Sequence, residues 1–415
     1  MMPPHTPGTG PARGPHPAPG PETEDRVARI TWSVIAEPGD SIALLARTLC
    51  GPAQALRLAR EGSAADLLTR LGGELPSDAS EPAGGTSRLR ADRALARWRS
   101  RLSTVDLDAV LEDARRRGIR IITPEDQEWP ELLGDLQETA PHCLWLHGPG
   151  RLDDLVGGRS VALVGSRAST AYGEDAAGSL GADFAARGGT VVSGGAYGID
   201  AAAHRGALAA PDGATIAVLA GGLDRLYPRG NTQLLERIRE RHLLVSEAPP
   251  GTAPTRWRFL ARNRLIAALS QAVVVVEASW RSGALSTARL TDQLSRPVGA
   301  VPGPITSAAS AGCHRLIRER GAVLITEPAE VLDLLPGGPA SGEGRFAAQD
   351  ELDLLSPSDR RVLDAVPPRS SLPAGRIAQE IGFELDEVTA ALARLALLGL
   401  VETTGERTRR ARTPR

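Results

Sequence analysis

Residues 161–167 read VALVGSR, in which four apolar residues are followed directly by glycine, serine and arginine. A continuously apolar run of this length indicates a strand that is buried on both faces, as in a parallel sheet. Five more runs of the same kind follow, each separated from the next by a helix-length stretch. They lie at residues 190–192, 214–219, 243–245, 272–276 and 298–301. Strands that alternate with helices in this way predict an α/β fold with a parallel sheet covered on both faces.

The sequence on either side of these runs divides into further segments. Residues 1–25 are rich in proline and glycine, lack an apolar stretch, and predict a disordered tail and not a signal peptide. Residues 26–100 carry helical patterns and predict a small helical domain, which leaves residues 101–335 for the sheet domain. A linker rich in glycine and proline is expected at residues 336–350.

The end of the chain predicts a small domain of its own. Residues 351–403 contain three short helical patterns followed by Leu400-Val401, an arrangement that resembles a winged helix, and residues 404–415 form a basic tail. The presumed recognition helix begins with acidic residues and has Arg394 as its one base. Acids at that end would repel phosphates, so a protein contact or a spacer role is favoured over reading duplex DNA.

Composition narrows the class of protein. The 415 residues carry a formal net charge of −2, and all of the basic residues are arginine. Residues 159–333 hold 19 arginines and 15 acids, so this part has an excess of four positive charges. The three cysteines, Cys50, Cys143 and Cys313, form no disulfide framework and no metal knuckle, which fits a reducing cytoplasm. No apolar run is long enough to cross a membrane, and no metal is expected.

The loops after the predicted strands carry the functional signals, because ligands of open α/β sheets bind beyond the carboxyl ends of the strands. Gly165 permits close approach of the backbone, Ser166 offers a hydroxyl, and Arg167 adds a forked donor, which together indicate a phosphate site. The sequence has no dinucleotide fingerprint after Gly165 and no P-loop, so no cofactor is expected.

The second loop, SGGAYGID at residues 193–200, again has glycines for close approach, among them Gly194. Asp200 and His204 are more simply a helix cap and an i,i+4 pair than an acid and a base. No strand-end loop assembles a nucleophile with a base, so the sequence favours a binding protein over an enzyme.

A third signal is RWRFLARNR at residues 256–264, with four arginines and two aromatics in nine residues. Arginine binds phosphates and aromatic faces stack on bases, a combination that suits a single strand because a duplex hides its base faces. The alternative is an amphipathic helix start with buried aromatics and solvated arginines. Arg262 and Arg264 have the further alternative of an ion pair with Glu247 or Glu277.

In their order and spacing these motifs resemble the DNA-processing protein A family (DprA, also called Smf) over about residues 126–335. The matching residues are Val164-Gly165-Ser166-Arg167, residues 193–200, Ala203-His204, Tyr227-Pro228, Ser246-Glu247, Arg262-Asn263-Arg264, Glu277-Ala278, Ser282-Gly283 and Val301-Pro302-Gly303. The resemblance implies an extended Rossmann domain that binds single-stranded DNA without sequence preference, forms a homodimer and helps to load RecA in natural transformation. It also implies a small helical (SAM-like) domain before the core and a winged helix after it.

The residues expected to contact DNA come from these loops and from the arginine-rich segment. They are Gly165, Ser166, Arg167, Gly194, Arg256, Phe259, Arg262, Asn263 and Arg264. Ile317 and Leu324 match apolar dimer positions of the family, although both also fit the inner face of a last helix and strand.

Two enzyme classes remain as alternatives to a DNA-binding protein. A nucleotide phosphoribohydrolase needs a PGGxGT-like loop, which GGLD at residues 221–224 is not. A dinucleotide oxidoreductase lacks its glycine fingerprint here.

Overall fold

The structure is a computed structural model that describes residues 23–73, 75, 86–337, 355–367, 370–405 and 407–411. The chain divides into two compact units, Met1–Pro339 and Ala340–Arg415, and each is considered by itself. Of the tail predicted at residues 1–25, residues 1–22 lie outside the described residues, and Glu24 and Asp25 instead begin a helix whose N-cap is Thr23. Most of the predicted linker also lies outside the described residues. Within the described residues, no helix combines the length and the apolar character that crossing a membrane requires.

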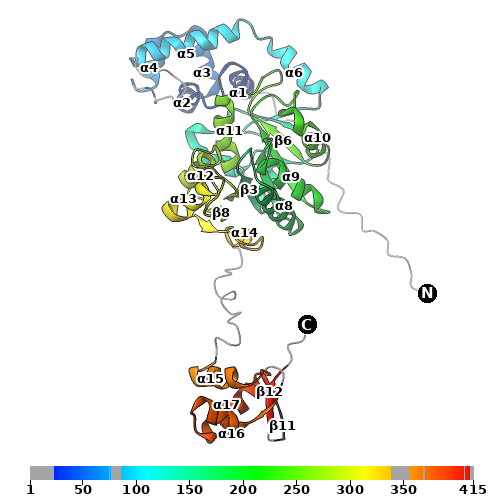
Figure 1. The fold of residues 1–415 in the computed structure, drawn as a ribbon. Helices are drawn as coiled ribbons and strands as arrows, with labels where there is room; N and C mark the ends of the chain where they lie inside the picture. The colour runs from blue at the N-terminus through cyan, green and yellow to red at the C-terminus, as the bar shows by residue number, and fades with distance from the viewer. Residues whose placement is uncertain are drawn as a thin grey trace, which may run out of the picture. The chain divides into compact units, whose positions relative to one another are not determined.

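A sheet of nine strands within the described residues forms the centre of the first unit (Figure 1). Its order is β1-β2-β6-β5-β4-β3-β7-β8-β9, with parallel pairing from β6 to β9 and antiparallel pairing for β1 and β2. The strands are β1 (Arg120–Ile122), β2 (Leu144–His147), β3 (Ser160–Val164), β4 (Thr190–Gly194), β5 (Ala214–Leu219), β6 (Leu243–Ser246), β7 (Ala272–Val275), β8 (Val298–Ala300) and β9 (Val323–Leu324). This arrangement confirms the predicted α/β class with a large, mostly parallel sheet.

The strand order reverses at β3. The chain runs outward from β3 through β4 and β5 to β6, and then returns to place β7, β8 and β9 on the other side of β3. The loops that leave β3 and β7 therefore diverge from neighbouring strand ends, which is where open α/β sheets bind ligands.

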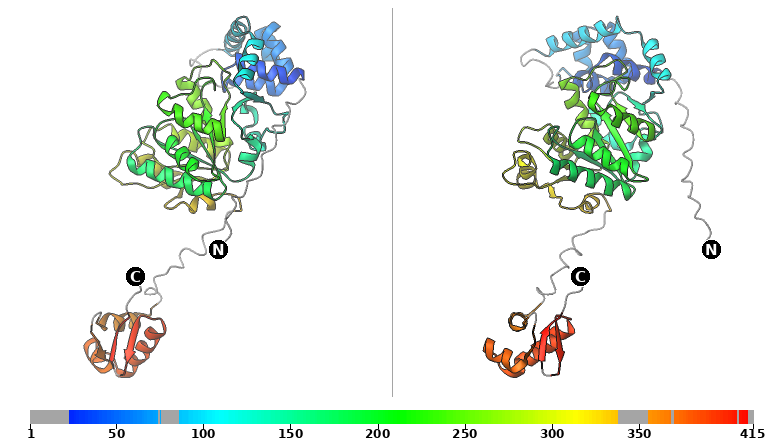
Figure 2. Two further views of the ribbon diagram at one scale, coloured as in Figure 1. Left: turned by 90° about the vertical axis from the view of Figure 1, so that its right-hand side faces the viewer. Right: turned by 45° about the vertical axis from the view of Figure 1, so that its right-hand side comes forward.

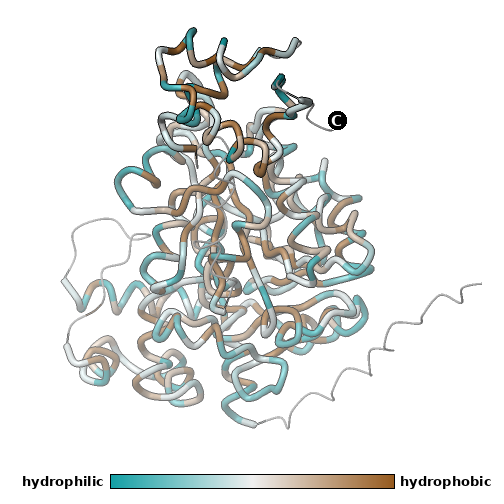
Figure 3. Tube along the Cα trace, turned by 90° about the horizontal axis from the view of Figure 1, so that it is seen from below, coloured by the Kyte–Doolittle hydropathy of each residue, from teal (hydrophilic) through white to brown (hydrophobic). Residues whose placement is uncertain are grey.

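Helices cover both faces of the sheet, as continuously apolar strands require. One face carries α8 (Ala171–Ala186), α9 (Ile199–Ala209), α10 (Thr232–Arg241) and α14 (Glu330–Asp333). The other carries η1 (Glu131–Thr139), α7 (Leu152–Gly157), α11 (Arg256–Ala268), α12 (Ala284–Gln293) and α13 (Ala311–Arg320). A short helix, η2 (Arg229–Asn231), precedes α10. Figure 3 shows hydrophobic residues along the inner strands and hydrophilic residues around the rim.

The N-terminal helices pack together at one end of this unit (Figure 2). They are α1 (Glu24–Ile35), α2 (Ser41–Cys50), α3 (Pro52–Glu61), α4 (Ala64–Arg70) and α5 (Ser87–Leu102). Their core is centred on Trp32 and Trp98, which are fully buried and meet edge to face at 4.9 Å between ring centroids. The helix that follows, α6 (Leu107–Arg116), packs instead on the sheet face that carries α10. Because these helices share a compact unit with the sheet, a separate helical domain at residues 26–100 stays a prediction.

The second unit combines helices with a small antiparallel sheet. Its elements are α15 (Pro357–Ala365), β10 (Leu372–Pro373), α16 (Ala374–Ile381), α17 (Leu385–Leu397), β11 (Val401–Thr404) and β12 (Arg407–Arg410), with strand order β10-β12-β11. The predicted basic tail at residues 404–415 differs from the structure, which places Arg407–Arg410 in a strand. The cause is the period-two pattern of that segment, which puts Thr408 on the buried side.

Candidate nucleic-acid interface

A cavity of about 300 Å³ lies where the strand order reverses, between the loops that follow β3 and β7. We call it the strand-end pocket. The start of α11 and the loop after β4 complete its wall. The residues that line it are Val164, Gly165, Ser166, Arg167, Ala196, Asp200, Phe259, Leu260, Arg262, Asn263, Ile266, Ser282, Gly283, Ala284 and Thr287. The sequence predicted a site at these strand ends, and six of the nine residues expected to contact DNA line the cavity. Gly194, Arg256 and Arg264 do not.

Arg167 and Phe259 form one side of this pocket, and a second aromatic ring lies behind Phe259. The guanidinium carbon of Arg167 lies 4.5 Å from the centre of the Phe259 ring, a cation–π distance. The Tyr227 ring lies 6.0 Å from the Phe259 ring at a tilt of 48°. Among the described residues, Arg167 has no hydrogen-bond or ion-pair partner, so its exposed guanidinium is available to an anion.

Two further groups can bind a phosphate. Asn263 is 8% exposed and lines the pocket, and its carboxamide has no hydrogen-bond partner in the described part of the chain. Arg256 is the first residue of α11, is exposed, and likewise has no partner within the described ranges, but it is not among the residues that line the pocket. An amide and a guanidinium both donate to phosphate oxygens.

Arg262 lies beneath the pocket and has little exposed surface. Its Nη1 donates to the backbone oxygen of Val218, and its Nε is buried without a partner. Burial lowers the pKa of Arg262 to about 10, against the opposing effect of Asp200, so the side chain still carries its charge at neutral pH. Gly194 makes room for this arrangement, because a Cβ there would collide with both Arg262 and Asp200. Arg262 and Asp200 thus lie together at the floor of the pocket, in the space that Gly194 leaves open.

Arg264 is held in an ion pair. Its two terminal nitrogens donate to the two Glu247 oxygens at 2.7 Å each, and both residues are at most 7% exposed. This is the alternative that the sequence left open, and Glu247 is the partner. With both terminal nitrogens engaged by the carboxylate, the guanidinium is not free to bind a phosphate.

Arg258 also has a structural role, because it is paired with a carboxylate. It donates to both carboxylate oxygens of Glu37 at 2.9 Å, and Arg101 donates to the same carboxylate. Burial would raise the pKa of Glu37, but the hydrogen bonds from the two arginines lower it overall. The start of α11 is therefore fastened to the segment between α1 and α2. In residues 256–264, this leaves Arg256 as the one described arginine without a partner.

Gly165 and Ser166 have structural roles in the loop after β3. A Cβ on Gly165 would lie 2.6 Å from the Ile199 side chain and 2.9 Å from the Glu277 backbone oxygen. The Ser166 amide donates to that same oxygen at 2.8 Å, and its hydroxyl donates to the Ala168 backbone oxygen at 3.0 Å. Both Ser166 donors are thus already used, so the glycine and the serine position Arg167.

The predicted pairing of Asp200 with His204 is wrong. His204 is fully buried, with Nδ1 2.7 Å from Thr215 Oγ1 and Nε2 2.8 Å from the Gly194 backbone oxygen. Asp200 instead accepts a hydrogen bond from the Ala196 amide at 3.3 Å. Burial lowers the pKa of His204 to about 4, so the ring is neutral at physiological pH. The histidine joins α9 to β4 and β5.

The sequence places Tyr227 in a loop after a predicted strand, but Tyr227 was not among the residues expected to contact DNA. In the structure it follows β5, is 50% exposed and lies beside the Phe259 ring, outside the lining of the pocket. Its contact with Phe259 joins segments that are separate in sequence.

Comparisons with known proteins identify the family to which this chain is similar. The model of a family described as DNA recombination-mediator protein A matches residues 120–336. A relative from Mycobacterium tuberculosis, named putative DNA processing protein DprA, is 43% identical over 304 residues, covering 70% of this chain and 77% of the relative. Protein Smf from Escherichia coli is 39% identical over 225 residues, covering 52% of this chain and 58% of the relative. The solved structure of DNA processing protein A (DprA) from Streptococcus pneumoniae is 31% identical with a TM-score of 0.58, covering 76% of this chain and 99% of that chain.

Proposed function

The chain belongs to the DNA recombination-mediator protein A family, and we propose from this that it binds single-stranded DNA in the strand-end pocket without base preference. The observation that carries the proposal is the unpaired guanidinium of Arg167 held against the Phe259 ring, with Tyr227 beside it. A free cation next to two aromatic rings can bind a phosphate and the face of an adjacent base together. Duplex DNA offers the phosphates but not the base faces.

In this proposal each group has a defined part. Arg167 and Arg256 neutralise backbone phosphates, and the Asn263 amide donates to a phosphate oxygen. Phe259 and Tyr227 stack on bases. Stacking and phosphate contacts do not distinguish one base from another, so little sequence preference is expected.

Titration of a labelled oligonucleotide against salt tests the proposal. Affinity for a single strand should far exceed affinity for a blunt duplex of equal length, and it should fall steeply as salt rises. Arg167→Ala should weaken binding and make the slope of log affinity against log salt shallower by about 0.7 for the lost phosphate contact. Arg187→Ala is the matched control, because Arg187 is exposed and paired with Asp183 on α8. Equal affinity for the duplex would refute the proposal.

We propose further that the protein acts by binding and performs no turnover. His204, which follows the loop after β4, uses both ring nitrogens in hydrogen bonds within the fold and does not line the strand-end pocket. Incubation with nucleoside monophosphates tests for a phosphoribohydrolase. Product in excess of enzyme, formed by the unmodified protein and lost in Arg167→Ala, would contradict this proposal.

We also propose a homodimer that helps to load RecA during natural transformation or recombination in the cytoplasm. Its support is family membership together with the apolar Leu324, which is 48% exposed on the edge strand β9. RecA loading is measured as the onset of RecA ATPase on single strands already coated with a single-strand binding protein. Addition of this protein should shorten the lag, and an unchanged lag would contradict a loading role.

For the C-terminal unit we propose a winged helix that contacts protein and does not read duplex DNA. Arg394, the base of α17, donates to Asp359 at 2.6 Å, and Arg409 of β12 pairs with Glu402. These two arginines are neutralised within the unit, and Asp386 and Glu387 in the first turn of α17 would repel phosphates. Deletion of residues 340–415 should therefore leave affinity for a blunt duplex unchanged.

A further inference from the structure

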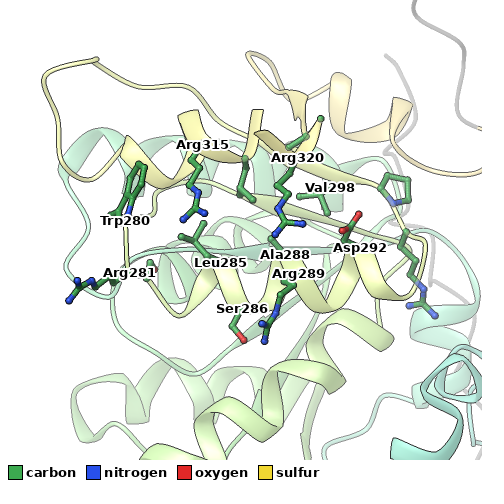
Figure 4. Close-up of a pocket in the computed structure, with 16 residues that line it drawn as sticks. Trp280, Arg281, Leu285, Ser286, Ala288, Arg289, Asp292, Val298, Arg315 and Arg320 are labelled. Atoms are coloured by element: carbon green, nitrogen blue, oxygen red, sulfur yellow. The ribbon is translucent and has the colours of Figure 1, made fainter. Parts of the chain in front are cut away.

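A second and larger cavity lies between α12 and α13, on the same sheet face as α11. Its volume is about 560 Å³. Figure 4 shows Arg315 and Arg320 reaching from α13 toward α12, with Trp280 beside Arg315 at one end. We call this cavity the arginine–tryptophan groove. The residues that give it its chemistry are Trp280, Arg281, Arg289, Asp292, Arg315 and Arg320.

The groove is strongly positive. In the described part of the chain, Arg281, Arg289 and Arg320 are exposed and have no hydrogen-bond or ion-pair partner. Asp292 is the one acidic residue in its lining. A fifth lining arginine, Arg296, is committed to the fold through three backbone oxygens of the segment that ends α11. Unpaired arginines gathered in a concave surface attract a polyanion.

Trp280 adds an aromatic face to this charge. Its side chain is 53% exposed, and the guanidinium carbon of Arg315 lies 4.9 Å from its ring centre. Arg315 is itself held by Glu319 at 2.8 Å, so the cation that orients the ring has a fixed position. Arg315 and Trp280 therefore have the same arrangement as Arg167 and Phe259, in which a guanidinium lies over an aromatic ring.

The two cavities are contiguous. Ser282, in the loop between β7 and α12, lines both the strand-end pocket and the arginine–tryptophan groove. A chain molecule that occupies the pocket therefore reaches the groove by passing the start of α12, without crossing a surface of opposite charge.

We propose that the arginine–tryptophan groove continues the single-strand path, with Trp280 stacking on a base and Arg281, Arg289 and Arg320 neutralising phosphates. This inference rests on the proposed function of the strand-end pocket. An acidic peptide would satisfy the arginines, but it would leave the exposed indole without a function and would not account for the continuity through Ser282. The chemistry of the groove thus favours a nucleic-acid strand.

The test compares oligothymidylates of two lengths on the full-length protein, about six nucleotides to fill the pocket and about twenty to reach the groove. Trp280→Ala should weaken binding of the longer strand about tenfold, the loss expected for one stacked base, and leave the shorter strand unaffected. Arg320→Ala should weaken the longer strand and reduce its salt slope by about 0.7. Arg318→Ala is the matched control, because Arg318 lies on the same helix, is exposed and does not line the groove.

A spectroscopic readout is independent of affinity. The longer strand should quench tryptophan fluorescence, and most of that quenching should be absent in Trp280→Phe. If Arg167→Ala leaves both lengths unchanged, the proposed function fails and this inference fails with it. If Arg167→Ala weakens both lengths while Trp280→Ala and Arg320→Ala alter neither, the extension alone is overturned. Loss of polyglutamate binding in those two variants, with unchanged DNA binding, would assign the groove to an acidic peptide instead.

Discussion

At the scale of single residues, the strand-end pocket depends on which cations the fold leaves unpaired. Arg167 and Arg256 are free among the described residues, whereas Arg258 and Arg264 are bound by carboxylates. The paired arginines hold α11 in place, whereas Arg167, in the loop after β3, lines the pocket with its guanidinium unpaired. Positioning and binding are therefore assigned to different arginines.

Phe259→Ala tests the stacking role of the aromatic ring. The substitution should reduce affinity for single-stranded DNA by about 1–3 kcal/mol, because both a base platform and the surface that orients Arg167 are lost. Phe259 is half-buried, so a moderate decrease in thermal stability is also expected. Phe259→Tyr is the control and should retain affinity. A large fall in melting temperature with unchanged affinity would show that the ring is a packing residue.

Arg264→Met tests whether this arginine has a structural role and does not bind DNA directly. Removal of this arginine leaves the Glu247 carboxylate buried without its partner, which should destabilise the protein by about 3–5 kcal/mol in urea unfolding. The second substitution Glu247→Gln should recover part of that loss. Where the variant is folded, its DNA affinity should be near that of the unmodified protein. Normal stability with abolished DNA binding would instead place Arg264 in direct contact with the strand.

At the scale of elements, His204 joins α9 to the neighbouring strands β4 and β5. Thr215 lies on β5, and Gly194 ends β4 immediately before the loop that borders the pocket. A neutral imidazole suits this dry position, and burial lowers its pKa to about 4 from the ordinary value of 6.5. The stability of this junction is consequently linked to pH.

The sign of that linkage follows from proton binding. Between the two pKa values the unfolded chain binds a proton at this histidine and the folded chain does not, so stability decreases as pH falls. The contribution is fully present above the unfolded pKa and should decrease by on the order of 2 kcal/mol between about pH 7 and pH 5. Urea unfolding at several pH values measures it. His204→Gln should show a shallower dependence, and an identical slope in both proteins would contradict the assignment.

At the scale of the whole molecule, the edge of the sheet offers an apolar surface for the proposed dimer. β9 ends the nine-stranded order of the described residues, and it exposes Val323 and Leu324 by about half. Ile317 on α13 is partly buried against the core of the same unit, so it contributes to folding as well as to any contact. An apolar patch at a sheet edge is the kind of surface that a two-fold dimer buries twice.

Leu324→Arg is therefore the more specific test of the dimer. Ile317→Arg should also lower the stability of the fold, because Ile317 packs against the core. Light scattering on the unmodified protein at tens of micromolar should give the mass of a dimer, and Leu324→Arg should shift it toward the monomer with little change in melting temperature. The variant should still bind short oligonucleotides but lose cooperativity on long ones. A monomer of the unmodified protein, with and without DNA, would refute the dimer.

Several features of this protein follow from the sequence without its tertiary structure. The six apolar runs predict the parallel strands because burial on both faces is a local requirement on composition. The glycines and Arg167 after the first run locate the ligand site, because the carboxyl ends of parallel strands share one edge of the sheet. Both predictions use only the order of residues along the chain.

The tertiary structure decides which of these side chains are free to act. Glu37 and Glu247 capture two arginines of α11, and Glu37 lies more than two hundred residues from Arg258. Tyr227, Phe259 and Arg167 come from three separate segments, and Trp280 meets Arg315 across a groove between two helices. Pairing and stacking depend on distances of a few ångströms between residues remote in sequence, and only packing of the whole chain sets those distances.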